Sequence, residues 1–468
     1  MLPISELRVR ITGVTEIPEP TNIQSTGDWY YLDHVSSGLA LYDSAKKTFV
    51  PMLAETWRQE ADGRHTFKLR ANAKFHDGTP ITTKDVAWSI KRHLIFKTST
   101  HFPLWEYLVG CDDLKNLKDE CEGLKFTESE ITFRLKKQVD SFYLQLASPE
   151  TGVWWSSDMD PDTAKLSPTK FSGAYFVAGR DEDSALLKRN EENQISKEFP
   201  NSPRSIRIKR VPVSKMDYAS INKDIDLAIK MHTPLGERDW RKDGLGVYAT
   251  TPSSIIYFFG LGQKDRPAVG ADLLQALWKN NKDSVLSSSA SFLPYSSVYG
   301  LSEREFLKAL GPKTAKKLRV LYPEGFFPAA FLEQIQKAAQ SIGSEIVFSP
   351  LAAKDFMAAF TSEKIAGEYD YILSAYAASE RYPAVQLRYL TKSRAKPPID
   401  LKEAESPDFN GDRVKIFHDY EKWLLSSRQA IPLYFDVTLF VHQKNIDIGE
   451  QSKSDAEIEL WRVTERRP

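Results

Sequence analysis

The sequence is poor in the residues and patterns that mark several classes of protein. It has 2 Cys and 23 Gly among 468 residues, and none of the glycines forms a dinucleotide-binding fingerprint. No stretch approaches the roughly 18 apolar residues that a membrane-spanning helix needs. Neither sign of charge is in excess, because 63 Lys and Arg balance 63 Asp and Glu. Nucleic-acid binding usually requires a basic excess, so that class is disfavoured.

The sequence also lacks the motifs of common enzymes. It has no Gly-x-Ser-x-Gly elbow, no Gly-x-x-x-x-Gly-Lys phosphate loop and no His-Glu-x-x-His zinc helix. The 8 His are scattered, and His418 and His442 are the candidates for a metal contact in the folded chain. A single His on a helix is far more often a surface or core residue. We therefore expect no catalysis, no cofactor and no resident metal.

The two cysteines, Cys111 and Cys121, lie ten residues apart. A zinc site is disfavoured, because no His or second Cys pair lies nearby. A local disulfide would indicate an oxidising compartment, and the spacing leaves both a disulfide and two unpaired thiols open. The N-terminal stretch MLPISELRVR lacks the apolar core of an export signal. We expect either a cytoplasmic chain or one from which a leader was removed.

What the chain does have is the composition of a globular protein. It is 41% hydrophobic and 27% charged, and its length predicts roughly three structural units of about 150 residues. The early chain contains short alternating segments, such as RHTFKLR at 64–70 and SEITFRLKK at 129–137, which predict half-buried strands. From about residue 257, longer helices and apolar strands take over. A β-rich part therefore precedes an α/β part.

His76 and Asp77 stand side by side in KFHDGTPITTKDVAWSIKRHL, which raises the question of a catalytic or metal site. The surrounding residues have a simpler local use. Asp77-Gly78 is a turn dipeptide, and Thr82 can N-cap a helix with Asp85 in its first turn. Two ligands do not complete a metal site, and no partner lies at a recognisable spacing. We predict a turn followed by a helix.

The second part alternates strands and helices. SIIYFFGLG at 254–262 is a short apolar run typical of a buried strand. The segment 316–350 reads as strand, helix and strand, which a parallel crossover fits best. IPLYFDVTLFVH at 431–442 is predicted as strand. We expect an open, doubly wound α/β domain.

Motifs between residues 49 and 92 follow a defined order: a Pro-x-Leu-Ala-Glu-x-Trp entry, an alternating strand, a Phe-His-Asp-Gly-x-Pro turn and a capped helix. The positions that carry this order are Pro51, Leu53, Ala54, Glu55, Trp57, Phe75, His76, Asp77, Gly78, Pro80, Asp85 and Val86. The region resembles the signature of the family 5 extracellular solute-binding proteins, the peptide-, nickel- and sugar-binding receptors of ABC importers. Weaker matches extend the resemblance over nearly the whole chain.

The resemblance implies a bilobal α/β fold of the periplasmic-binding-protein type, with two lobes joined by a hinge. The first lobe would comprise residues 1–40, 160–252 and 440–468, with an extra β-rich subdomain at 41–159. The second lobe would run from 253 to 439. A ligand would lie in the cleft and be trapped by hinge closure.

Peptide-binding members of this family carry a Gly-Trp-x-Ala-Asp-Tyr-x-x-Pro segment, whose Asp holds the α-ammonium group of the peptide. The counterpart here is AYAASERYP at 375–383, with Tyr376 in place of the Trp and Ser379 in place of the Asp. A hydroxyl carries no charge, and charge-assisted contacts are about twice as strong as neutral ones. Glu380 could replace the missing acid, or Arg381 could receive a carboxylate or phosphate. The alternative is a loop without ligand contact.

Aromatic side chains near the expected cleft edges are further candidates for ligand contact, although core packing is their more common role. These candidates are Tyr30, Tyr31, Trp154, Trp155, Tyr257, Phe258 and Phe259. Adjacent residues of an extended segment point in opposite directions. One of Trp154 and Trp155 is therefore expected to pack while the other faces the cleft.

These observations predict a receptor that captures a small polar ligand, such as an oligopeptide or dipeptide, and delivers it to the permease subunits of an ABC importer. We expect a periplasmic or surface-associated monomer that meets the membrane only through a lipid anchor or the transporter. Two alternatives stay open. One is a cytoplasmic ligand-sensing domain of a transcription regulator with this fold, and the other is a receptor for a sugar, metal chelate or anion.

Overall fold

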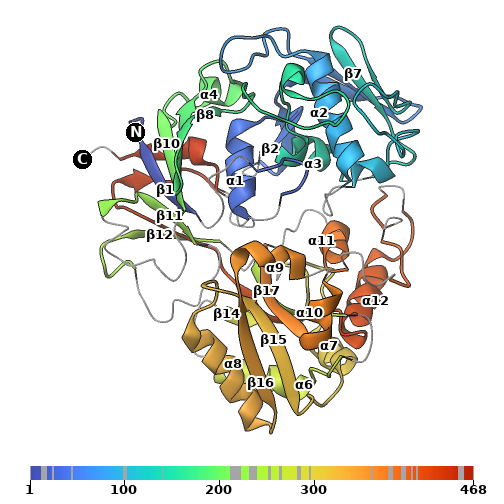
Figure 1. Ribbon diagram of the computed structural model, residues 1–468, viewed down its shortest axis with the longest axis vertical. Helices are drawn as coiled ribbons and strands as arrows, with labels where there is room; N and C mark the ends of the chain where they lie inside the picture. Colours follow the sequence, from blue (N-terminus) through green and yellow to red (C-terminus); the bar gives the residue numbers. More distant parts are fainter. Residues whose placement is uncertain are drawn as a thin grey trace.

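The chain folds into two lobes stacked along the long axis of the molecule in the computed structural model (Figure 1). The structure describes residues 2–11, 18–23, 26–43, 46–97, 103–139, 141–210, 223–230, 240–250, 254–262, 266–281, 286–294, 297–359, 362–377, 383–391, 397–401, 404–406, 409–451 and 458–466. Both ends of the described chain lie in the upper lobe, where Leu2 and Glu465 form an antiparallel bridge.

The upper lobe is built on a seven-stranded mixed sheet. Its order is β12 (Gly246–Ala249), β19 (Leu439–His442), β11 (Leu227–Lys230), β1 (Leu7–Ile11), β10 (Ser205–Arg210), β9 (Ser184–Arg189) and β8 (Tyr175–Arg180). The central strand β1 runs parallel to both neighbours, and the outer pairs are antiparallel. Alternate residues Leu7, Val9 and Ile11 are buried, as a sheet with a packed face requires. Around this sheet lie α1 (Thr26–Val35), α4 (Gln194–Glu198), η5 (Leu460–Arg462), β20 (Ile446–Asp447) and β21 (Thr464–Glu465).

A β-rich subdomain with its own hydrophobic core extends the upper lobe. Its four-stranded antiparallel sheet has the order β4 (Ala54–Gln59), β5 (Arg64–Leu69), β7 (Glu130–Arg134) and β6 (Leu124–Phe126). The other elements are β2 (Ala40–Asp43), β3 (Thr48–Pro51), α2 (Thr83–Phe96), α3 (Phe142–Ala147), η1 (Leu104–Glu106), η2 (Pro149–Thr151) and η3 (Ser156–Asp158). Cys111 and Cys121 form a buried disulfide in this core, which decides between the two states that the spacing left open.

The predicted turn and helix at His76 and Asp77 are confirmed. Gly78 has a φ of 85°, a conformation that glycine adopts without strain, and Asp77 forms an ion pair with Lys170 (2.8 Å). Helix α2 begins after a capping box, in which the Asp85 carboxylate accepts hydrogen bonds from the Thr82 N–H (2.8 Å) and hydroxyl (2.7 Å).

The lower lobe contains a six-stranded mixed sheet flanked by helices. Its order is β14 (Leu286–Ser288), β18 (Ala430–Asp436), β13 (Ser254–Gly260), β17 (Tyr371–Ala377), β15 (Lys317–Pro323) and β16 (Glu345–Leu351). The predicted parallel crossover is confirmed, because β15 runs parallel to β16, whereas β13 is antiparallel to both neighbours. The helices are α6 (Ala271–Asn280), α7 (Glu303–Leu310), α8 (Ala329–Ser341), α9 (Ala353–Ala359), α10 (Glu363–Glu368), α11 (Pro383–Tyr389) and α12 (Arg413–Ser426).

The strand predicted at 431–442 is present, but it is divided in two. The segment forms two strands, β18 and β19, which belong to different sheets. Both strands are buried along their whole length, so the apolar pattern continues through the point where the chain changes sheets. Pattern alone therefore gave no sign that the chain passes from one lobe to the other here.

Asp85 also ties α2 to a distant segment, since its carboxylate accepts a hydrogen bond from the Ser156 N–H (2.7 Å). Asp85→Ala should lower the free energy of unfolding by about 2–4 kcal/mol, because the buried N–H groups would lose their acceptor. Asp412→Ala is the matched control, since Asp412 caps the exposed start of α12 through the Lys415 N–H and should cost about 1 kcal/mol. Urea unfolding measures both variants. Equal losses of unfolding free energy would mean that the hydrogen bond between Asp85 and Ser156 adds no stability beyond that of helix capping.

Candidate ligand site between the lobes

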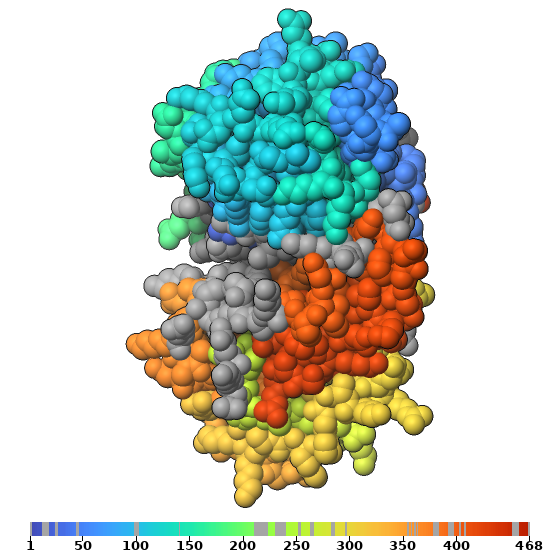
Figure 2. All heavy atoms as spheres, turned by 90° about the vertical axis from the view of Figure 1, so that its right-hand side faces the viewer, coloured from blue at the N-terminus to red at the C-terminus, as the bar shows by residue number. Residues whose placement is uncertain are grey.

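The chain passes between the lobes at two places in the sequence. One segment leads from β12 to β13, and the other leads from β18 to β19. They are hydrogen-bonded to each other, because the Thr250 N–H donates to the Thr438 carbonyl oxygen (3.0 Å) and the Thr438 N–H donates to the Thr250 hydroxyl oxygen (2.9 Å). Figure 2 shows a groove in the surface between the upper and lower lobes. Paired connecting segments of this kind act as a hinge for domain closure.

The sheet of the lower lobe presents one edge to this junction. In the register of the sheet, Ala377 at the end of β17 lies opposite Ser254, and Ser254 lies opposite Asp436. Because Ser254 and Asp436 are the first and last residues of the strands that lead to the hinge, the chain leaves β17 at the hinge edge. The predicted ligand residues Ser379, Glu380 and Arg381 follow directly, and they lie outside the described residues.

Buried hydroxyl groups lie at the same edge. Ser254 and Thr438 are 1% and 0% exposed, and neither hydroxyl oxygen has a hydrogen-bond partner among the described residues. A buried polar group without a partner costs free energy, about 1–3 kcal/mol. Polar groups that a ligand or a water can satisfy are therefore present where the two lobes meet.

The end of β17 is supported from behind by the loop that follows β14. The Tyr376 hydroxyl donates to the Phe292 carbonyl oxygen, and its ring packs edge-on against Tyr257 at a centroid distance of 5.3 Å. The loop is in turn held by Glu421 of α12, whose carboxylate accepts hydrogen bonds from the Ser291 hydroxyl and the Phe292 N–H, both at 2.6 Å. This chain of contacts fixes where the predicted ligand segment begins.

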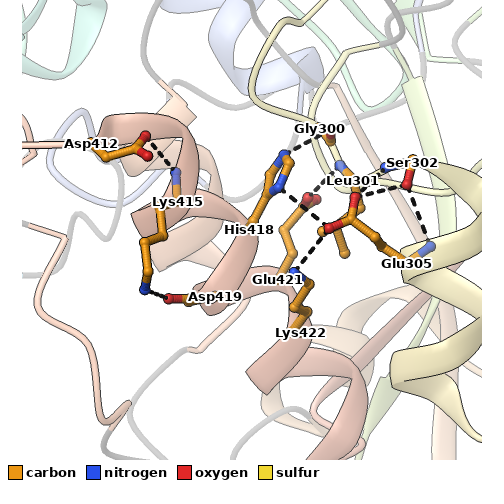
Figure 3. Close-up of polar contacts among 10 residues, drawn as sticks. All are labelled: Gly300, Leu301, Ser302, Glu305, Asp412, Lys415, His418, Asp419, Glu421 and Lys422. Atoms are coloured by element: carbon orange, nitrogen blue, oxygen red, sulfur yellow. Dashed lines mark hydrogen bonds and ion pairs between the residues drawn. The ribbon is translucent and has the colours of Figure 1, made fainter.

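Figure 3 shows further contacts that hold this loop, where α12 faces the start of α7. Glu421 also accepts a hydrogen bond from the Leu301 N–H (3.1 Å). His418 contacts the Gly300 carbonyl oxygen (3.1 Å), and Lys422 pairs with Glu305 (3.1 Å). No group of three or more metal-binding side chains gathers within the part of the chain that the structure describes. His418 thus has a structural partner in the loop.

The aromatic candidates of the upper lobe lie mainly in its cores. Tyr30 accepts a hydrogen bond from the Ile458 N–H at its hydroxyl (3.0 Å), and Tyr31 is buried beside it on α1. Trp154 is buried, whereas Trp155 is partly exposed and carries the Lys170 ammonium 4.0 Å above its ring. The opposite placement of these two neighbours agrees with an extended segment. Ligand contact by any of the four stays a prediction.

In the lower lobe, Tyr257, Phe258 and Phe259 are buried in β13, and Tyr376 is 9% exposed in β17. All four belong to one hydrophobic core. Packing accounts for their aromatic character without a ligand, and a role in binding likewise stays a prediction. The structure brings Tyr257 and Tyr376 together but does not bring either to the upper-lobe candidates.

One contact between the lobes was not anticipated from the sequence. The Tyr107 hydroxyl of the subdomain donates to Glu405 (2.5 Å) and accepts from Arg388 (2.9 Å), both in the lower lobe. Burial raises the pKa of the Glu405 carboxyl above its ordinary value, although the Arg388 guanidinium opposes that rise. No local pattern links these residues, because 281 and 298 positions separate Tyr107 from its partners.

A pocket inside the upper lobe does not compete with the junction as a solute site. It is lined by residues that include Asp33, Ser36, Ser37, Met52 and Trp461, and it offers about 10 Å³ of free space. That space holds about one water molecule. A solute the size of a dipeptide does not fit there.

The fold matches a known class of proteins, the two-lobed solute-binding proteins. A sequence profile of the bacterial extracellular solute-binding proteins, family 5, matches residues 48–281, which is half of the chain. The chain belongs to this family. A curated binding protein of Haemophilus influenzae is 28% identical over 219 residues, which cover 45% of this chain and 38% of that protein. The chain thus spans well under half of that relative's length.

Solved structures of family members share the whole fold. The murein tripeptide binding protein MppA of Escherichia coli superposes with a TM-score of 0.78 at 16% identity, covering 99% of this chain and 98% of its own. NikA from Brucella suis, solved in complex with Fe(III)-EDTA, superposes with a TM-score of 0.73 at 14% identity, covering 98% and 100%. At these identities the likeness establishes the bilobal architecture. No helix among the described residues is long and apolar enough to cross a bilayer.

Glu421 gives the site region a pH dependence. Burial raises the pKa of its carboxyl from 4.5 to about 7, although the three hydrogen bonds lower it. Between about pH 4.5 and 7 the folded protein keeps this proton and the unfolded chain loses it. The contribution of Glu421 to the free energy of unfolding should therefore fall as the pH rises through this window, by about 3 kcal/mol in total.

Glu421→Gln removes this titration, so the stability of wild type minus that of the variant should fall from pH 4.5 to 7 and then stay level. Glu305→Gln is the control, because hydrogen bonds from Ser302 and Lys422 lower the pKa of Glu305 to about 2, outside the window. Urea unfolding at a series of pH values gives both difference curves. A level curve for Glu421→Gln would show that the buried carboxyl is already ionised at pH 5.

Proposed function

We propose that this protein is the solute-capturing receptor of an ABC importer and that it acts by closing its lobes on a small polar ligand, without a covalent step. The observation that carries the proposal is the junction itself. Two paired connecting segments allow closure, and the strand that precedes the predicted ligand segment ends at the same edge. Membership of the extracellular solute-binding family supports this reading.

An extracytoplasmic location is part of the proposal. The Cys111–Cys121 disulfide supports it, because disulfides persist in oxidising compartments and are rare in the cytosol. The same disulfide counts against a cytoplasmic ligand-sensing domain. We further propose that the receptor works as a monomer and meets the membrane through the permease subunits or a lipid anchor.

The class of ligand depends on Ser379, which stands where peptide-binding relatives have an Asp. Relatives of the same fold include a murein tripeptide receptor and a protein solved with a metal chelate, so the fold is compatible with either class. A peptide would require Glu380 or another acid to take the place of the missing Asp. A carboxylate, phosphate or chelate ligand would instead use Arg381. The Ser254 and Thr438 hydroxyls are additional groups that such a ligand could satisfy.

The first test is the mass of the purified protein under native and denaturing conditions. We expect a difference equal to one small solute, which extraction would identify. Protein without bound solute should be screened against peptides, sugars, chelates and anions by thermal melting. Binding adds about 2.7 kcal/mol of stability at a hundredfold excess over the dissociation constant. Absence of a response to all four classes would contradict the receptor proposal.

Ser379→Asp should restore the carboxylate that peptide-binding relatives use. A tripeptide with a free α-ammonium group should then bind roughly tenfold more tightly than to wild type, because a neutral contact becomes charge-assisted. The same tripeptide with an acetylated N-terminus is the control and should not gain affinity. Calorimetric titration measures both peptides, and an equal response to the two would remove residue 379 from the ammonium site.

Arg381→Ala addresses the anionic alternative. Affinity for a ligand with a free carboxylate should fall by more than about tenfold if the contact is buried. The amidated form of the same ligand should be unaffected, since it offers no charge to the guanidinium group. Unchanged affinity for the carboxylate form would exclude Arg381 from the site.

A further inference from the structure

We infer that Tyr107, Arg388 and Glu405 form an interlobe latch, which favours the closed arrangement of the two lobes independently of the ligand. The inference deepens the proposed function, since it concerns the closure on which capture depends. It rests on the contact across the junction rather than on the ligand residues. The latch is defined by these three side chains alone.

The latch joins the lobes through the hydroxyl group of Tyr107. Tyr107 donates to a Glu405 carboxylate oxygen (2.5 Å) and accepts from the Arg388 guanidinium (2.9 Å), while Arg388 and Glu405 form an ion pair (2.7 Å). All three are shielded from water, with side-chain exposures of 16% for Arg388 and 4% for Glu405, and Tyr107 is 1% exposed. Hydrogen bonds to charged groups are stronger than neutral ones, particularly where water is excluded.

Charges around the latch are complementary across the junction. Glu106 of the upper lobe attracts Arg388 but repels Glu405, and Lys137 of the upper lobe attracts Glu405. Each charge of the lower-lobe pair therefore has an opposite charge on the subdomain, and the repulsion between Glu106 and Glu405 offsets part of this attraction. Complementary fields of this kind favour one docked arrangement over others.

Both halves of the latch are held firmly within their own lobes. The Tyr107 carbonyl oxygen accepts from the Lys136 N–H (2.7 Å), and the Leu108 N–H donates to Leu104 within the same turn (3.2 Å). In the lower lobe, Arg413 donates to the Ala404 and Ser406 carbonyl oxygens on either side of Glu405, at 3.2 and 2.5 Å. The latch therefore joins two parts of the chain that are each fixed within their own lobe, and not two mobile side chains.

The latch lies away from the hinge. Helix α11, which carries Arg388, stands at the edge of the lower lobe that faces the upper lobe, and β12, at whose end the chain leaves the upper lobe, lies to its left in the view of Figure 1. Rotation about the hinge must therefore separate Tyr107 from its partners. The ion pair stays intact, because both of its members belong to the lower lobe.

Tyr107→Phe tests the latch with little disturbance, since the ring keeps its place in the subdomain core and only the hydroxyl is lost. We expect the ratio of closed to open molecules to fall by roughly tenfold to hundredfold. Tyr175→Phe is the matched control, because its buried hydroxyl donates to Pro203 within the upper lobe (3.0 Å). Thermal melting of both variants verifies that each is folded.

The measurement is small-angle X-ray scattering of protein freed of ligand by unfolding, washing and refolding with its disulfide intact. Wild type and Tyr175→Phe should give the same compact radius of gyration, and Tyr107→Phe should give a larger one. Two results overturn the latch: wild type that is already as extended as Tyr107→Phe, or Tyr107→Phe that is as compact as wild type. Because no ligand is used, either result leaves the receptor proposal to its own mass and melting tests.

Discussion

The structure depends on the way in which the chain connects its two sheets. It crosses between them along neighbouring segments at residues 250 and 438, which are hydrogen-bonded to each other. A single connection would leave the lobes free to twist, whereas a paired one restricts them mainly to opening and closing about one axis. Because of this restriction, the same groups on the facing edges of the two lobes meet each time the lobes close.

The hinge also explains why the second lobe needs rigid support behind the edge of its sheet that faces the hinge. β17 ends opposite the first residue of β13, so any looseness of β17 would move the segment that follows it relative to the hinge. The contacts from Glu421 through Phe292 to Tyr376 remove that looseness with buried hydrogen bonds. Burying a carboxyl is costly, and here three donors reduce the cost.

Much of this architecture could be predicted from the sequence because local signals were strong. Asp77-Gly78 and the Thr82–Asp85 capping box identified a turn and a helix start, and both are present. The apolar pattern at 431–442 did not show which strand belongs to which sheet, because a buried strand looks alike in either one, and the lobe boundary expected at residue 439 came from the family resemblance. The latch was equally invisible, since its residues meet only through the tertiary fold. The ligand residues were proposed from family resemblance, and physics of the sequence alone would not have selected them.

The arrangement of charge in the latch bears on how such a receptor can open again. An ion pair shared between lobes would place an unpaired charge on each side at every opening, at a cost of several kcal/mol if either stayed buried. Here both charges of the ion pair lie in the lower lobe, so the pair stays intact on opening and the hydrogen-bond partner that it loses is the neutral Tyr107 hydroxyl. A contact of that strength shifts the closed population, and thereby the apparent affinity for a ligand, without making closure irreversible. The latch and the ligand then act on one equilibrium, so a ligand that contacts both lobes needs less differential affinity to complete closure.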